Sequence, residues 1–148
     1  MKVCKSLGLD EARIIAEAGI EAAHKTGSRG MTITVVDRHG DPVCLMRMDG
    51  PGGGTVRMAL AKAYTAIATL WDTIEFRKFL PEEEVAAYEL FPIPNFTCIP
   101  GGVLVRTKDG TVVGAVGTSG RQATGPGSDE EIARSAAKAF ERTEGFKN

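Results

Sequence analysis

Two pairs of apolar, β-branched segments, each joined by a run of turn-forming residues, set the main constraint on how this chain can fold. The first pair extends from Met31 to Met48 around the turn Asp37-Arg38-His39-Gly40-Asp41-Pro42. The second extends from Gly102 to Ser119 around Lys108-Asp109-Gly110, and an Asp-Gly dipeptide between apolar runs is typical of a tight turn. Both segments are therefore predicted to form antiparallel β-hairpins.

Helical patterns precede, separate and follow the two hairpins. A first helix is expected to begin at Asp10 as its N-cap, and Thr55 is expected to cap a second helix with an apolar stripe from Val56 to Trp71. A short helix is predicted over Glu82–Leu90, and Ser128-Asp129-Glu130-Glu131 matches the capping box of a last helix. Hairpins interleaved with helices in this order predict an α+β fold.

The charges are balanced and spread along the chain. Its 148 residues include 18 Lys and Arg and 19 Asp and Glu, which gives a formal net charge of −1. No basic face gathers the positive charge that nucleic-acid binding requires, so nucleic acid is not expected as a partner. Met1 to Ile20 lacks the continuous apolar stretch of a secretory signal or a membrane span. We therefore expect one domain over residues 1–148, located in the cytoplasm and not attached to a membrane.

The three cysteines, Cys4, Cys44 and Cys98, are widely spaced and include no Cys-x-x-Cys pair. Without a histidine at metal-ligand spacing, they do not predict a structural zinc site. Cys44 falls inside a predicted strand, where a free cysteine is typically a small buried apolar side chain.

A glycine-rich run, Gly50 to Gly54, leads into the helix expected at Thr55. Backbone N–H groups at such a position favour an anion, although the run has neither the P-loop nor the dinucleotide-binding spacing. Lys62 follows on the same helix, away from its apolar stripe, so its ammonium group is expected to point to a cleft or to solvent. Two interpretations are open: the loop and Lys62 face one bound anion, or the loop is a flexible connection and Lys62 is a surface lysine.

The two histidines differ in their predicted surroundings. His24 shares a side of the first helix with Arg13, Glu17 and Ile20 and is expected to be accessible. An accessible neutral imidazole can ligate haem iron or another metal, and simple solvent exposure is the alternative. His39 lies in the turn of the first hairpin and is expected to be solvated.

Three arginines, Arg47, Arg57 and Arg121, suit the bidentate binding of a carboxylate, with ordinary surface ion pairs as the alternative. Ser119 superficially resembles a nucleophile, but Arg121 stands where the Gly-x-Ser-x-Gly elbow needs glycine. No histidine is in an obvious partner position, so a hydrolytic triad is not expected. Ser119 is instead grouped with the residues that could contact a ligand.

Several blocks of the sequence, taken in order, resemble the GlcG/HbpS family, which includes the C-terminal domain of PduO-type proteins. They are Thr34-Val35-Val36-Asp37-Arg38-His39-Gly40, Arg47-Met48-Asp49-Gly50, Lys62-Ala63-Tyr64-Thr65-Ala66, and Gly101-Gly102 with Val113-Gly114-Ala115-Val116-Gly117-Thr118-Ser119-Gly120. The resemblance extends from Leu9 to Phe140. Its departures are Ala61, Val103-Leu104 and the loop from Phe91 to Pro100, and they concern the ligand pocket rather than the fold.

The resemblance implies a profilin-like α+β fold whose antiparallel sheet, built on the two hairpins, has about five strands flanked by helices. It also implies assembly into homo-oligomers, and haem or a related tetrapyrrole as the ligand. His24 is then the candidate axial ligand, and Lys62 or a nearby arginine would pair with the propionates. The residues expected at the ligand are His24, Arg47, Arg57, Lys62, Gly101, Gly102, Ser119 and Arg121.

A second hypothesis is an enzyme or sensor that acts on a small carboxylate or ring compound, with the cationic side chains gathered around the glycine loops. These are Arg47, Arg57, Lys62 and Arg121. Aromatic residues between Trp71 and Pro100 could line its pocket, namely Trp71, Phe76, Tyr88, Phe91 and Phe96. The same segment could instead form a dimer contact.

Overall fold

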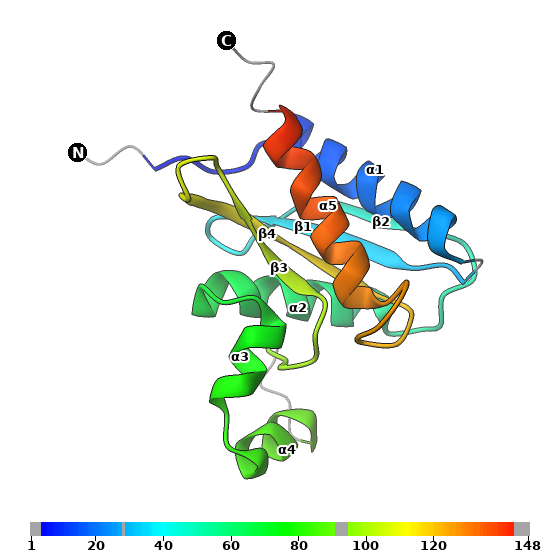
Figure 1. Cartoon of the computed structure of the whole chain (residues 1–148), viewed down its shortest axis with the longest axis vertical. Helices are drawn as coiled ribbons and strands as arrows, with labels where there is room; N and C mark the ends of the chain where they lie inside the picture. Colours follow the sequence, from blue (N-terminus) through cyan, green and yellow to red (C-terminus); the bar gives the residue numbers. More distant parts are fainter. Residues whose placement is uncertain (1–3, 28, 91–94, 144–148) are drawn as a thin grey trace.

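Both predicted hairpins are present, and together they form one antiparallel sheet (Figure 1). The computed structural model describes residues 4–27, 29–90 and 95–143. Its strands are β1 (Thr32–Asp37), β2 (Pro42–Arg47), β3 (Gly102–Arg106) and β4 (Val112–Ser119). β1 pairs with both β2 and β4, and β3 pairs with β4, so the strand order is β2-β1-β4-β3. The two hairpins therefore join through their inner strands, and β2 and β3 form the edges.

The sheet has four strands in the described part of the chain, where about five were expected. The segment before the first helix approaches the sheet, because the Leu7 N–H donates to the Val113 carbonyl at 3.0 Å. Residues 4–8 nevertheless form no strand of their own. The fold class is as predicted, and the strand count is corrected to four.

Helices cover both faces of this sheet. α1 (Leu9–Thr26) and α5 (Asp129–Thr143) pack side by side on one face, and α2 (Thr55–Thr69) packs on the other (Figure 1). α3 (Thr73–Phe79) and α4 (Glu82–Leu90) extend away from the sheet beyond α2. The short helix predicted over Glu82–Leu90 is confirmed, whereas Phe91 to Pro94 lie outside the described residues. No helix in the described ranges combines the length and the hydropathy needed to cross a bilayer.

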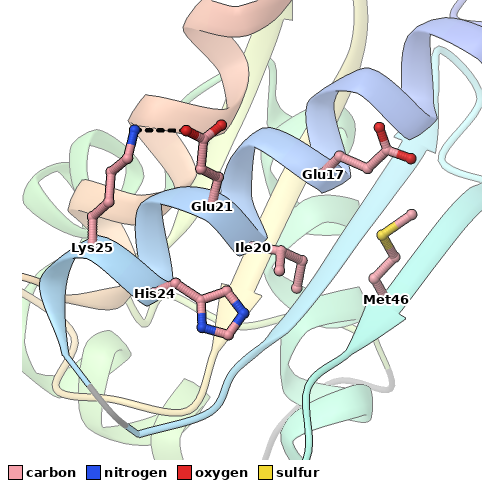
Figure 2. Close-up of a pocket in the computed structure, with 6 residues that line it drawn as sticks. All are labelled: Glu17, Ile20, Glu21, His24, Lys25 and Met46. Carbon is pink, nitrogen blue, oxygen red and sulfur yellow. Dashed lines mark hydrogen bonds and ion pairs between the residues drawn. The ribbon is translucent and has the colours of Figure 1, made fainter.

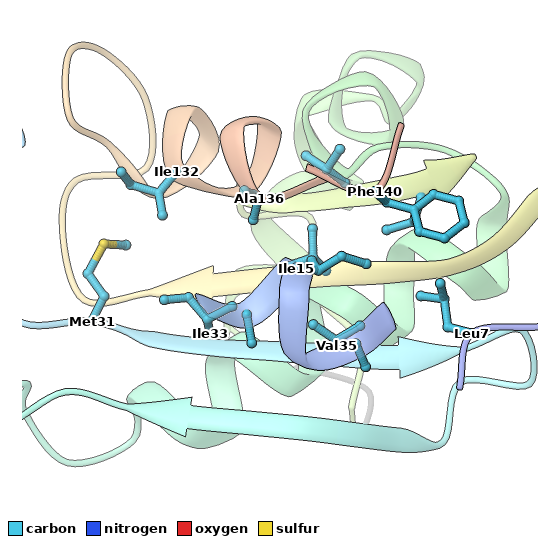
Figure 3. Packing of buried hydrophobic residues seen from close by; sticks show 14 of the residues in the cluster. Leu7, Ile15, Met31, Ile33, Val35, Ile132, Ala136 and Phe140 are labelled. Atoms are coloured by element: carbon cyan, nitrogen blue, oxygen red, sulfur yellow. The ribbon is translucent and has the colours of Figure 1, made fainter. Parts of the chain in front are cut away.

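The main core lies between the sheet and the layer formed by α1 and α5 (Figure 3). Ile33 and Val35 of β1 belong to this core. The next residue along the strand, Val36, points to the opposite face, where it packs with Ala63 and Ala66 of α2. β1 is therefore buried on both sides and is the centre of the fold.

Two predicted helix starts need small corrections. α1 begins at Leu9, and the N-cap position is occupied by Gly8, whose N–H donates to the Glu11 carboxylate at 3.1 Å. Asp10 stands in the first turn, where its negative charge interacts favourably with the helix dipole. It does not occupy the N-cap position. Thr55 is likewise the first residue of α2 rather than its cap. The N-cap at Ser128 is confirmed, since its hydroxyl accepts the Glu131 N–H at 3.2 Å.

α2 lies close to the sheet because glycines occupy the strand positions beneath it. Gly102 of β3 and Gly117 of β4 stand opposite each other in the strand pairing. A Cβ atom on Gly117 would lie 2.0 Å from the Ala59 carbonyl oxygen, and one on Gly102 would lie 2.2 Å from the Lys62 carbonyl oxygen. Only glycine permits this approach, so the helix backbone rests directly on the strands.

The buried face of α2 differs from the predicted apolar stripe. The helix ends at Thr69, and Leu70 follows in the left-handed conformation with a φ of 59°. Leu70 and Trp71, the end of the predicted stripe, are exposed. The residues that α2 does bury are Ala59, Ala61, Lys62, Ala63, Thr65, Ala66 and Ile67. Ala59, Ala63 and Ile67 are buried as predicted, and Ala61, Lys62, Thr65 and Ala66 are buried in addition to them.

Candidate functional site

A hollow of about 530 Å³ opens on the surface between α1 and the edge strand β2 (Figure 2). Its lining is almost entirely apolar, although charged side chains surround it. The residues that line it are Glu17, Ile20, Glu21, His24, Lys25 and Met46. A volume of this size falls within the range of about 300–1,000 Å³ that is usual for ligand sites.

The helix geometry places Ile20 and His24 on one side of α1. They are four residues apart, so they lie one above the other, while Ala16 and Ala23 face the core. Met46 pairs with Ile33 across β1 and β2, which turns its side chain toward the α1 face of the sheet. The imidazole of His24 is exposed, as predicted, and makes no hydrogen bond or ion pair with the described residues. Both of its ring nitrogens are therefore available to a ligand.

A second hollow, of about 480 Å³, continues the first along the end of β2. It shares Ile20, His24 and Met46 with the first hollow and adds Arg47, Met48 and Asp49. We refer to the two together as the α1–β2 groove. Of the residues predicted to contact a ligand, His24 and Arg47 are thus brought together at one surface site.

Lys62 is buried, and the prediction that its ammonium points to a cleft or to solvent is wrong. Its side chain is 1% exposed, and its Nζ lies 2.7 Å from Asp129 Oδ2 and 2.9 Å from the Thr118 carbonyl oxygen. Burial lowers the pKa of Lys62, while the adjacent Asp129 carboxylate opposes that shift. Burial likewise raises the pKa of Asp129, opposed by Lys62. Each charge thus depends on the other, and the pair ties α2 to the start of α5.

The glycines predicted at the ligand use their backbone donors within the protein. The Gly101 N–H donates to Glu130 at 2.9 Å, and the Gly102 N–H donates to the Thr73 hydroxyl at 2.9 Å. Glu130 is itself buried, which raises the pKa of its carboxyl against the effect of Arg134, 2.7 Å away. These contacts give Gly101 and Gly102 a structural role in joining β3 to α3 and α5.

The guanidinium of Arg121 also binds internal partners. It donates to the carbonyl oxygens of Ala23 at 2.7 Å, Arg29 at 2.8 Å and Gly27 at 3.1 Å. It therefore fastens the C-terminal end of α1, the end that carries His24, to the loop before α5. This side chain is a backbone clamp and not the free carboxylate clamp that was predicted.

The remaining predicted site residues lie away from the α1–β2 groove. Ser119 is buried and pairs with Thr32 in the sheet, and Arg57 is exposed on the first turns of α2. The glycine-rich loop from Gly50 to Gly54 is also largely exposed. None of them lines the groove, so their contact with a ligand stays a prediction.

The described aromatic residues after α2 form two separate ring pairs, and the pocket considered for the whole group stays a prediction. Phe76 and Phe96 pack edge to face with ring centroids 5.6 Å apart, and Trp71 instead contacts Phe79. The Tyr88 side chain and the whole of Phe91 lie outside the described part of the structure.

Two important residues escaped the sequence-based predictions. Met46 was assigned to a strand, but only the pairing of β2 with β1 places it opposite His24. The sequence predicts Asp129 only as part of a helix cap, whereas its carboxylate pairs with a lysine 67 residues away in the sequence. The four-residue spacing of Ile20 and His24 was the one signal that indicated a shared surface.

Comparison with known proteins gives a consistent assignment. A family model described as haem degrading protein HbpS-like matches residues 7–138. No curated protein matches the chain.

Among solved structures, Streptomyces reticuli HbpS, crystallised as a double mutant, is 32% identical, with a TM-score of 0.76 over 93% of this chain and 89% of that one. Klebsiella pneumoniae protein ORFY, of the DUF336 family, is 25% identical, with a TM-score of 0.81 over 95% and 94% of the two chains. PduOC, crystallised as a complex with haem, shares the fold at 23% identity, with a TM-score of 0.75 over 90% and 94% of the two chains.

Proposed function

This chain belongs to the HbpS-like family of haem degrading proteins, and we propose that it binds haem or a related tetrapyrrole in the α1–β2 groove with His24 as the axial ligand. The observation that carries the proposal is the position of the His24 imidazole. It is exposed and unpaired among the described residues, and it stands over an apolar surface made by Ile20 and Met46. Such a surface suits the flat face of a porphyrin.

The residues of the groove suit haem iron, most of whose ligands come from the porphyrin and not from the protein. Among the described residues, no three His, Cys, Asp or Glu side chains gather to hold a bare metal ion. Haem iron needs only one or two ligands from the protein, because the porphyrin supplies four. One histidine in an apolar groove therefore suffices. When bound, haem supplies iron redox chemistry, and the axial ligand and its surroundings tune it.

Charged residues around the groove determine how the propionates would lie. Lys25 and Arg47 are the cations at its edge, and Glu17, Glu21 and Asp49 are the anions. Lys25 forms an ion pair with Glu21 at 2.6 Å, but this pair is exposed and such pairs contribute little, so Lys25 can change partners. Arg47 and Lys25, rather than the buried Lys62, are therefore the side chains proposed to bind the propionates.

Titration with haemin tests the proposal. We expect the wild-type protein to develop a Soret band with a defined endpoint. The absorbance spectrum of the His24→Ala variant with haemin should lack the features of histidine-ligated haem iron. This variant should also bind haemin at least about tenfold more weakly, a loss of about 1.4 kcal/mol in binding free energy. His39→Ala is the matched control, because His39 is the other histidine of the chain and lies in the β1–β2 turn. An unchanged spectrum and affinity in His24→Ala would remove the proposed ligation.

The small-carboxylate hypothesis loses two of its four cations, since Lys62 and Arg121 are engaged within the protein.

We also infer that the protein forms homo-oligomers, as the GlcG/HbpS resemblance implies, and that it works in the cytoplasm. None of the cysteines Cys4, Cys44 and Cys98 is in a disulfide, which agrees with a reducing compartment. Cys44 is half-buried rather than fully buried, and this burial raises the pKa of its thiol.

A further inference from the structure

The last turn of α1, which carries His24, is held by a side chain that does not line the α1–β2 groove. The Arg121 guanidinium donates to the Ala23 carbonyl oxygen at 2.7 Å and to the Thr26 hydroxyl at 2.8 Å. The Thr26 hydroxyl in turn donates to the Ala22 carbonyl oxygen at 2.8 Å. The last carbonyl groups of a helix have no partner within the helix, so Arg121 supplies donors to an end that needs them.

The His24 imidazole depends on that turn for its position. His24 lines both hollows of the groove (Figure 2), and its ring makes no hydrogen bond or ion pair with the described residues. A histidine that binds a metal usually donates its second ring N–H to a protein group, and this contact fixes the ring. In the described part of the chain no such group holds His24, so the backbone of the last turn sets where the ring lies. Helix ends fray, which makes the contacts of Arg121 to this turn important.

Arg121 also holds the segment that leads to the opposite wall of the groove. Its Nε and one of its terminal nitrogens donate to the Arg29 carbonyl oxygen at 3.0 Å and 2.8 Å. Two residues further along the chain, the Met31 carbonyl oxygen accepts the Met48 N–H at 2.9 Å. Met48 lines the second hollow, on the wall that faces His24. One guanidinium is thus connected to the backbone of both walls.

The backbone of Arg121 is itself anchored inside the protein. Its N–H donates to the Asp129 carboxylate at 2.9 Å, and Asp129 is held in turn by the buried ammonium group of Lys62 at 2.7 Å. The guanidinium also donates to the Gly127 carbonyl oxygen at 3.1 Å. A group that positions a ligand residue is effective when its own support is rigid. Arg121 therefore reaches the two walls from a buried, paired anchor.

We propose that Arg121 is a positioning residue for the haem site. Without contact to haem, it holds the His24 imidazole where it can ligate the iron and sets its separation from the wall at Met48. This role rests on the proposed ligation by His24. Loss of a group that orients a metal ligand typically lowers affinity by about 10–100-fold. Arg121→Ala should therefore bind haemin at least about tenfold more weakly than the wild type.

A double-mutant cycle, measured by haemin titration, tests this role. It compares the wild type, Arg121→Ala, His24→Ala and the double variant. If Arg121 acts through His24, Arg121→Ala should weaken binding at least about tenfold in the wild type, but less than about twofold once His24 is removed. Equal losses in the two backgrounds overturn the positioning role. An unchanged affinity in His24→Ala alone removes the proposed ligation itself, so the two failures are distinguishable.

The absorbance spectrum of bound haem gives a second readout, which a loss of stability alone would not change. At saturating haemin, Arg121→Ala should contain a fraction of haem that lacks the features of histidine ligation. Arg142→Ala is the matched control for the loss of a guanidinium, because Arg142 is exposed in the last turn of α5. This control should keep the wild-type spectrum and affinity.

Thr26→Val is a milder variant that serves if Arg121→Ala does not fold. It removes the hydroxyl that Arg121 binds and leaves the guanidinium and its other partners in place. Its spectrum and affinity should change in the same direction as those of Arg121→Ala, to a smaller extent. Histidine-ligated haem at the wild-type level and affinity in every folded variant of this pair overturns the positioning role.

Discussion

The ammonium nitrogen of Lys62 lies 2.7 Å from a carboxylate oxygen of Asp129, and both side chains are almost completely buried. The other carboxylate oxygen of Asp129 accepts a hydrogen bond from the backbone N–H of Arg121 at 2.9 Å. Lys62 also donates to the Thr118 carbonyl oxygen at 2.9 Å. The pair thus joins α2, the end of β4 and the start of α5. Because neither charge is solvated, each needs the other to remain charged inside the protein.

Lys62→Met should lower the free energy of unfolding by about 3–5 kcal/mol, because it leaves the Asp129 carboxylate buried without its counter-charge. The double variant Lys62→Met/Asp129→Asn should recover part of that loss, since it removes the unpaired charge. Urea unfolding measures both. Lys78→Met is the matched control, because its ion pair with Glu75 is exposed, and it should change stability by less than about 0.5 kcal/mol. Equal effects at Lys62 and Lys78 would contradict the role of burial.

Gly117→Ala should strongly destabilise the fold. The new methyl group would lie 2.0 Å from the Ala59 carbonyl oxygen and 2.6 Å from the Ala63 nitrogen, so α2 would have to move off the sheet. We expect a loss on the order of 3 kcal/mol or more, measured by thermal or urea unfolding. Gly53→Ala, where the added atom meets nothing within 4 Å, should change stability by less than about 0.5 kcal/mol. Similar stabilities for the two variants would argue against the close contact.

Arg121→Ala should release the C-terminal end of α1. The guanidinium donates to the Ala23, Gly27 and Arg29 carbonyl oxygens, and hydrogen bonds to charged groups contribute about 1.5–3 kcal/mol. Faster amide hydrogen exchange in the last turn of α1 should accompany a loss of that size. Arg121→Lys should restore less than half of it, because one ammonium group cannot reach all three oxygens. Arg57→Ala, at an exposed position, is the control. Unchanged exchange at the end of α1 would show that the clamp is dispensable.

Met46→Glu should weaken haemin binding at least about tenfold, because it places a charge on the apolar surface of the α1–β2 groove. Leu45→Glu is the matched control. Leu45 is the neighbouring residue of the same strand, exposed on the opposite face of the sheet. Absorbance titration measures both affinities. Equal effects of the two substitutions would place the haem elsewhere.

The β3–β4 turn should lose stability in acid through Asp109. Its carboxylate accepts hydrogen bonds from the Thr107 hydroxyl and from the Thr111 N–H at 3.1 Å. These bonds lower the pKa of Asp109 from 3.8 to about 2. A lowered pKa means that the stabilisation is present above pH 3.8 and is lost as the pH falls through about 2. Urea unfolding at a series of pH values measures this loss. In the Asp109→Asn variant, that part of the pH dependence of the free energy of unfolding should be missing. The same pH dependence in the wild type and in the variant would contradict the prediction.

Local patterns were enough to predict much of the fold. The hairpins, the helix over Glu82–Leu90 and the N-cap at Ser128 follow from β-branched runs, turn residues and capping chemistry, all of which act over a few residues. The accessibility of His24 could also be predicted, because it depends on the helix period alone.

The tertiary structure decided which distant residues meet. Lys62 is predicted to point to a cleft or to solvent because it lies away from the apolar stripe of its helix, and only the fold brings Asp129 within reach of its ammonium. Arg121 is predicted to clamp a carboxylate because guanidinium binds such groups through two N–H donors, but nothing nearby in the sequence reveals the carbonyl oxygens of Ala23 and Gly27 that it binds instead. The sequence alone thus determined the hairpins and the exposed histidine, since those depend on short-range geometry. The groove, the buried ion pair and the strand count depended on contacts between distant segments, which only packing could establish.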